Sequence, residues 1–149
     1  MKSELKTRPL QSLADAYAGH ELRVKPEYQR GTVWKLPQKQ GLIDSLLRGY
    51  QIPLFYVHLE ARPNHYTEEI EKTAWLVDGQ QRLAAIVGYR QNEFGLPDPK
   101  KAKPGSVLPP GATEVPPWTG KKFEELEPAE KERLLGRELL VIEMTAEHP

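Results

Sequence analysis

An apolar run in the middle of the chain ends at an Asp-Gly pair, and a helical pattern begins directly after it. Residues 74–77 are apolar, and Leu83, Ile86 and Val87 recur at the i, i+3, i+4 spacing of a helix with one buried face. We therefore expect a strand that turns sharply at Gly79 and enters a helix. The change from a continuous apolar run to helical spacing thus predicts a strand, a turn and a helix in that order, and the rest of the chain is organised around them.

The chemistry of this junction favours an anion. The first turn of a helix carries unpaired N–H groups and a partial positive charge, and Gly79 allows a positive φ or a close approach of a ligand. Arg82, one turn into the helix, supplies a fork of donors that matches phosphate or carboxylate. Asp78 fits such a site as a helix cap, a metal ligand or a group that orients water. The alternative is a plain turn with an N-cap, in which Gln80, Gln81 and Arg82 face solvent.

Composition limits the classes of function. The chain has 149 residues, enough for one modest domain, and its 21 basic and 21 acidic residues give no net charge. This balance argues against non-specific nucleic-acid binding by the whole surface but leaves room for a local basic patch. The chain has no cysteine, no signal-peptide pattern at its start and no apolar run of membrane-spanning length. We expect a soluble, cytoplasmic protein without a membrane partner.

Apolar periodicity and turn residues predict a small α/β (α+β) domain with a mixed sheet and packed helices. We treat residues 1–149 as a single domain and, because the chain stops soon after its last strand, as a fragment or N-terminal module of a larger protein. Polar residues between two of the strands indicate a hairpin-like excursion. The expected strands are 20–24, 54–59, 73–77 and 138–144, and the expected helices are 9–18, 37–48, 80–91 and 128–135.

A proline-rich stretch at 95–118 interrupts this pattern. Seven of the 14 prolines lie in it, together with the basic residues Lys100, Lys101 and Lys103. Such a segment has little apolar surface to bury and cannot form a regular hydrogen-bonded ladder, so we expect a mobile loop. The alternative is that its lysines contact DNA phosphates.

A second segment, residues 28–34, has two interpretations. Arg30 is placed to reach a phosphate, or Tyr28 and Trp34 anchor the core while Arg30 pairs with a carboxylate. No other catalytic pattern competes with these two segments. The four histidines lack zinc-ligand spacing, and the chain contains no P-loop, no G-x-G-x-x-G dinucleotide loop and no G-x-S-x-G nucleophile elbow.

Three motifs, in this order, resemble the N-terminal domain of GmrSD-type modification-dependent restriction proteins. They are Tyr28-Gln29-Arg30-Gly31-x-x-Trp34, the stretch LIDSLLRGYQIP from Leu42 to Pro53, and Val77-Asp78-Gly79-Gln80-Gln81-Arg82-Leu83, which contains the DGQQR motif. The same domain type is similar to the sensing part of restriction factors that recognise phosphorothioate-modified DNA. The resemblance implies a ParB/sulfiredoxin-like fold and nucleoside-triphosphate hydrolysis coupled to control of a DNA nuclease.

The resemblance also implies roles for individual residues. Arg82 and the backbone amides of Gly79, Gln80 and Gln81 would hold phosphates, and Asp78 or Gln81 would orient water or a Mg²⁺ ion. Asp78, Gln81 and Arg82 therefore form the implied catalytic group. Gln29 and Arg30 are further implied phosphate-binding residues. Three aromatic residues have two interpretations, because they either stack on a base or pack in the core: Tyr28, Trp34 and Trp75.

Three functions follow. The first is a nucleotide-binding, NTP-hydrolysing regulatory or sensor domain of an anti-phage restriction system, with Mg²⁺ as the accompanying ion and a nuclease domain or subunit as partner. The second is a sensor that grips the backbone of modified DNA without hydrolysing a nucleotide. The third is a structural module in which Asp78 caps the helix while Arg30 and Arg82 form buried ion pairs. The chain lacks the His-Asn-His motif of the family's nuclease domain, so we do not expect it to cleave DNA by itself.

Overall fold

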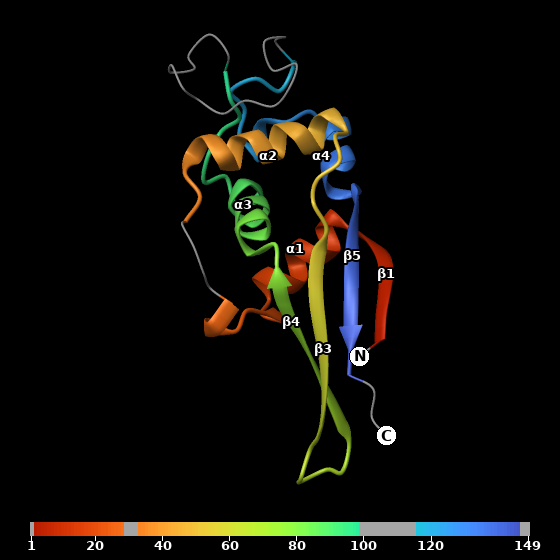
Figure 1. Ribbon diagram of the computed structural model, residues 1–149. Helices are drawn as coiled ribbons and strands as arrows, with labels where there is room; N and C mark the ends of the chain where they lie inside the picture. Colours follow the sequence, from red (N-terminus) through yellow and green to blue (C-terminus); the bar gives the residue numbers. More distant parts are fainter. Residues whose placement is uncertain (1, 29–32, 99–115, 147–149) are drawn as a thin grey trace. The chain divides into compact units, whose positions relative to one another are not determined.

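The computed structural model describes residues 2–28, 33–98 and 116–146, with Tyr28 described by its backbone alone (Figure 1). The chain falls into two compact units, of which the first comprises Met1–Gly31, Pro53–Gln80 and Glu138–Pro149, and the second Thr32–Ile52 and Gln81–Arg137. The elements in chain order are β1 (Lys2–Pro9), α1 (Leu10–Ala18), β2 (Leu22–Arg23), the 3₁₀ turn η1 (Pro26–Tyr28), α2 (Leu36–Arg48), β3 (Phe55–Pro63), β4 (Ile70–Asp78), α3 (Gln80–Arg90), the 3₁₀ turn η2 (Phe123–Glu125), α4 (Pro128–Leu135) and β5 (Glu138–Thr145).

The first unit contains a five-stranded mixed sheet and helix α1. The strand order is β1-β5-β3-β4-β2, in which β1–β5 and β3–β4 are antiparallel pairs, whereas β5–β3 and β4–β2 are parallel pairs. Helix α1 contacts β1 and β2 and buries its apolar face. The buried side chains of this unit include Leu10, Leu13, Phe55, Val57 and Val141. A mixed sheet and four α-helices among the described residues confirm the predicted α/β class, while the ParB/sulfiredoxin-like fold remains a prediction.

Strand β1 lies where the sequence predicts none. Its side chains are exposed at nearly every position, and Leu5 is 62% exposed, so it lacks the apolar alternation that marks a half-buried strand. The strand forms because its backbone pairs with β5 along its whole length at the edge of the sheet. An ion pair of 3.3 Å between Lys6 and Glu143 adds a side-chain contact to this pairing.

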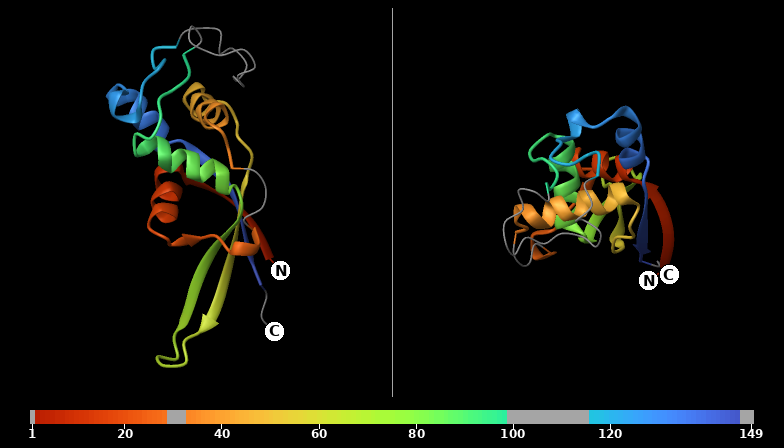
Figure 2. Two further views of the ribbon diagram at one scale, coloured as in Figure 1. Left: turned by 90° about the vertical axis from the view of Figure 1, so that its left-hand side faces the viewer. Right: turned by 90° about the horizontal axis from the view of Figure 1, so that it is seen from above.

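The hairpin of β3 and β4 is longer than predicted. The sequence pattern predicts strands 54–59 and 73–77 with a polar excursion between them, whereas β3 runs to Pro63 and β4 starts at Ile70. Beyond Leu59, β3 pairs with β4 alone, and this two-stranded ribbon projects from the sheet (Figures 1 and 2). Both faces of such a ribbon meet solvent, so no alternation of apolar and polar residues marks it in the sequence.

The second unit contains α2, α3 and α4. Gly49 follows the end of α2 and Pro128 begins α4, as expected for local helix stop and start signals. The ring centroid of Tyr89 lies 5.4 Å from that of Phe94 and 6.1 Å from that of Phe123, which places an aromatic cluster in this unit. Apart from β1 and the long hairpin, the predicted elements are present with ends shifted by at most two residues. Among the described helices, none is both long and apolar enough to cross a membrane.

The proline-rich prediction falls mainly on residues 99–115, which lie outside the described residues. The mobility of the segment 95–118 and the DNA contacts of its lysines therefore remain predictions. The described ends of the segment lie together, because the N–H of Leu96 donates to the carbonyl oxygen of Lys121 over 2.9 Å. Leu96 and Lys121, on either side of the undescribed residues, are therefore neighbours in the second unit.

Candidate functional site

The predicted junction is present between β4 and α3. Strand β4 ends at Asp78, helix α3 begins at Gln80, and Gly79 between them has φ +112°. Residues with a Cβ rarely adopt this conformation, so the turn depends on glycine. Gly79 is also buried. The expected strand, sharp turn and helix are therefore confirmed.

The sheet is distorted immediately before this junction. Tyr56 of β3 pairs with Asp78 of β4, whereas Val57 pairs with Leu76, so Val77 is an extra residue in the ladder. A bulge of this kind bends its strand and re-aims the side chains that follow, and bulges are frequent beside functional sites. Here the bulge lies directly before Asp78, the last residue of β4. Nothing in the sequence indicates it.

The three polar residues in the first turn of α3 lie in different environments. Gln80 and Gln81 are half-buried, and Arg82 is only 8% exposed. Arg82 also has interaction partners of its own. Its guanidinium therefore does not simply face solvent, in contrast to the plain-turn alternative.

A hydrogen bond connects this turn to the second predicted segment. The backbone N–H of Trp34 donates to Oε1 of Gln81 over 3.0 Å, across 47 positions of sequence. Trp34 thus lies beside the first turn of α3, with its side chain half-buried. Gln29, Arg30 and the side chain of Tyr28 lie outside the described residues. Their phosphate-binding and base-stacking roles remain predictions.

Asp78 is the carboxylate that directly precedes the turn, and it is exposed. Within the described parts of the chain, no group of three or more His, Asp or Glu side chains is arranged to hold a metal ion. Mg²⁺ is usually held by one or two carboxylates together with phosphate oxygens and water. The role of Asp78 as a Mg²⁺ ligand stays a prediction.

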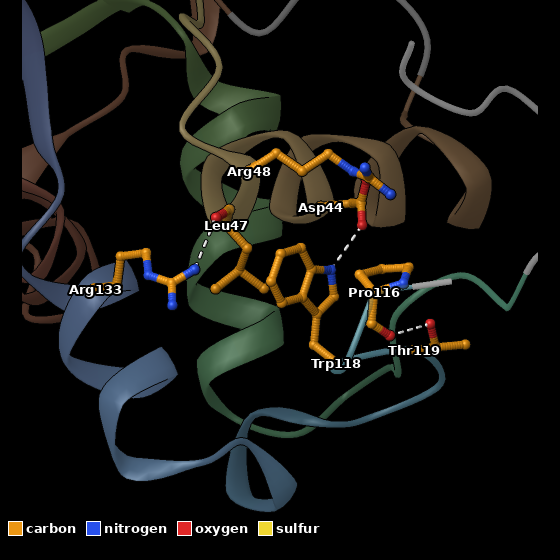
Figure 3. Close-up of polar contacts among 7 residues, drawn as sticks. All are labelled: Asp44, Leu47, Arg48, Pro116, Trp118, Thr119 and Arg133. Carbon is orange, nitrogen blue, oxygen red and sulfur yellow. Dashed lines mark hydrogen bonds and ion pairs between the residues drawn. The ribbon is translucent and has the colours of Figure 1, made fainter. Parts of the chain in front are cut away.

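The structure adds Asp44 and Trp118, to which the sequence assigned no role. Asp44 is 1% exposed, and its Oδ1 accepts the indole N–H of Trp118 over 2.8 Å while its Oδ2 accepts Nε–H of Arg48 over 2.6 Å (Figure 3). Burial lowers the pKa of Arg48, but the hydrogen bond and charge of Asp44, with Tyr50, outweigh burial and raise it overall. The sequence does contain one signal for this pair: Asp44 lies four residues before Arg48 on an otherwise apolar helix face, a spacing that allows the two side chains to pair.

Together, the mixed sheet and the junction define an α/β protein with a strand–glycine–helix turn. The chain belongs to the family described as GmrSD restriction endonuclease, N-terminal domain, whose family model matches residues 13–146. The match runs through both compact units and confirms the resemblance carried by the three motifs. A search of curated proteins and a search of solved structures gave no match. Family membership suggests a component of a restriction system that associates with a nuclease domain and with DNA.

Proposed function

We propose that this domain binds the triphosphate of a nucleoside triphosphate at residues 78–82, and that hydrolysis of the nucleotide regulates the nuclease of a restriction system. The observation that carries the proposal is Gly79, whose φ of +112° turns β4 directly into α3. A phosphate at this turn would meet the unpaired amides of the helix without obstruction from a Cβ.

Arg82 strengthens the case for an anion. A cation in the first turn of a helix is unfavourable, because the N-terminal end of the helix dipole is itself positive. Burial adds a desolvation cost, and Arg82 is only 8% exposed. Arg82 already has interaction partners within the protein, and a bound phosphate would add a further favourable interaction with both the helix dipole and the guanidinium. Each charge-assisted contact of this kind is worth roughly 1.5–3 kcal/mol.

Hydrolysis requires a water molecule positioned against the γ-phosphoryl group. The water adds to the γ-phosphorus, the bond to the β–γ bridging oxygen breaks, and a nucleoside diphosphate and inorganic phosphate leave. We assign the orientation of this water, or of a Mg²⁺ ion, to Asp78 and Gln81. Because Oε1 of Gln81 already accepts the N–H of Trp34, the amide NH₂ of Gln81 is the end that would contact a phosphate or the water.

Calorimetric titration tests the proposal. ATP, GTP, CTP and UTP are titrated, with and without Mg²⁺, into the wild type, Arg82→Ala and Arg90→Ala. Arg90 is the matched control because it lies in the last turn of the same helix. We expect Arg82→Ala to weaken NTP binding about tenfold to a hundredfold and Arg90→Ala to change it less than about twofold. Equal affinities of wild type and folded Arg82→Ala would refute a phosphate site at this turn.

DNA is the second candidate ligand, because family membership itself points to DNA. If the junction grips a DNA backbone, the wild type will bind modified duplex and no NTP. The logarithm of its affinity will then fall linearly with the logarithm of salt concentration, with a slope set by the number of phosphates contacted. If the motif is only structural, Arg82→Ala will lose stability and neither ligand will bind the wild type.

A further inference from the structure

The first unit contains a pocket of about 490 Å³, within the range of roughly 300–1,000 Å³ found for ligand sites. Besides Leu22 and Val24, it is lined by Tyr17 of α1, His20, Arg23 of β2, Trp75 of β4 and Gln80, the first residue of α3. All of these lining residues belong to the same compact unit. We propose that this pocket holds the base and ribose of the nucleotide whose phosphates lie at Gly79. The inference rests on the proposed function and assigns the other half of the ligand.

Two aromatic side chains give the pocket its stacking surface. Tyr17 and Trp75 are both half-buried, and both residues line the pocket. The Nζ atom of Lys25 lies 4.9 Å from the centroid of the Trp75 ring, and this cation–π contact helps to fix the indole. Bases stack on aromatic side chains regardless of sequence, because every base has a π-face. The wall therefore favours a base over an aliphatic ligand.

Polar groups accompany these rings. Arg23 and Trp75 are direct partners in the parallel pairing of β2 with β4, and Nε of Arg23 donates to the carbonyl oxygen of His20 over 3.2 Å. The indole N–H of Trp75 is buried and has no hydrogen-bond partner in the part of the chain that the structure describes. Unpaired buried donors are uncommon in folded proteins.

Gln80 places the pocket next to the phosphate site. Gln80 directly follows Gly79 and is the first residue of α3, so a ligand that fills the pocket lies beside the N-terminus of this helix. A nucleoside triphosphate has the matching order of parts, with the base and ribose at one end and the phosphates at the other. The geometry thus points to Trp75 as a stacking residue of this pocket.

The test compares ligands with and without a base. ATP, GTP, CTP, UTP and inorganic tripolyphosphate are titrated, each with Mg²⁺, into the wild type, Trp75→Leu and Arg23→Ala. Arg62→Ala is the matched control, because Arg62 is an exposed arginine of the same sheet that pairs with Glu60 and does not line the pocket. Circular dichroism checks that each variant is folded. Arg23 is exposed, so Arg23→Ala keeps the test decisive if Trp75→Leu does not fold.

We expect Trp75→Leu to weaken NTP binding about five- to 150-fold, the effect of losing one stacking partner, and to leave tripolyphosphate binding unchanged. Arg23→Ala should also weaken NTP binding alone, and Arg62→Ala should weaken neither. Equal losses for NTP and tripolyphosphate, or no loss for either, would overturn the pocket assignment while the phosphate site stands. If the wild type binds neither NTP nor tripolyphosphate, the proposed function is overturned, and this inference with it.

A base could also reach the pocket from DNA, and a short single-stranded oligonucleotide separates the two sources. We expect one of two results. Either the oligonucleotide does not bind, or it binds at Trp75 and NTP competes with it. Oligonucleotide binding that depends on Trp75, together with NTP binding that does not, would assign the pocket to a DNA base and overturn the mononucleotide assignment.

Discussion

Trp118 donates its indole N–H to Oδ1 of Asp44 over 2.8 Å, although the two residues are 74 positions apart in the sequence. Oδ2 of the same carboxylate accepts from Arg48, so both oxygens of this buried group are used. The guanidinium of Arg133 on α4 lies 6.0 Å from the Trp118 ring centroid and donates to the carbonyl oxygen of Leu47 (Figure 3). This network joins α2, α4 and the segment around Trp118 within the second unit.

Removal of the carboxylate should destabilise the second unit. Asp44→Ala leaves the Trp118 indole and the Arg48 guanidinium without their shared acceptor, and breaking a buried charged pair costs about 3–5 kcal/mol. Asp44→Asn should cost less, roughly 1–3 kcal/mol, because the amide oxygen still accepts one of the two bonds. Urea unfolding measures both losses, with Glu132→Ala as an exposed control on α4. An Asp44→Ala variant as stable as the wild type would show that apolar packing alone holds this segment.

Gly79→Ala should lower both stability and phosphate affinity. A Cβ at φ +112° costs about 1–3 kcal/mol of backbone strain, and it also stands where the phosphate would approach. Gly120 is the matched control, because its φ is +71° and an added Cβ would meet nothing within 4 Å. Thermal melts should show both alanine variants destabilised. Only Gly79→Ala should bind tripolyphosphate less tightly, and a similar loss in Gly120→Ala would trace the effect to stability rather than to the site.

Gln81→Glu separates the two roles of Gln81. Glutamate keeps an oxygen for the N–H of Trp34, and its charge interacts favourably with the N-terminal end of the helix dipole by about 0.3–1 kcal/mol. The variant should therefore be at least as stable as the wild type. The same charge repels phosphate, so NTP affinity should fall at least about tenfold in calorimetry. Gln81→Leu should instead lose stability, because it removes the acceptor. Undiminished NTP binding by Gln81→Glu would place the phosphates elsewhere.

The junction at Gly79 could be predicted because its determinants are local. The change of apolar period on either side of the Asp-Gly pair marks the strand and the helix, and glycine permits the turn. The ends of α2 and α4 are equally local, since Gly49 and Pro128 mark them. The pattern alone left a plain turn as an alternative, and the family resemblance was what connected the DGQQR motif with a nucleotide.

Features that depend on distant partners could not be predicted. Strand β1 has no apolar alternation and forms only because it pairs with β5, the last strand of the chain. Asp44 and Trp118 were visible as residue types, but their pairing exists only in the folded second unit. The pocket at Trp75 likewise draws its walls from α1, β2, β4 and α3, which no local pattern brings together.

Tyr89 should make the second unit sensitive to alkaline pH. Its side chain is fully buried, its hydroxyl donates to the carbonyl oxygen of Lys121, and burial, with the charges of Glu130 and Glu125, raises its pKa well above the usual value. The folded protein therefore holds this proton more tightly than the unfolded chain does. Its contribution to stability is intact below about pH 10, the unfolded pKa, and is lost as pH rises from there toward the folded pKa.

The variant Tyr89→Phe should be about 1 kcal/mol less stable than the wild type at neutral pH. Its stability should decline less steeply above about pH 10, which separates the effect of Tyr89 from that of lysines that titrate in the same range. Urea unfolding of both proteins across this range measures the two slopes, and equal slopes would show that ionisation of Tyr89 does not contribute.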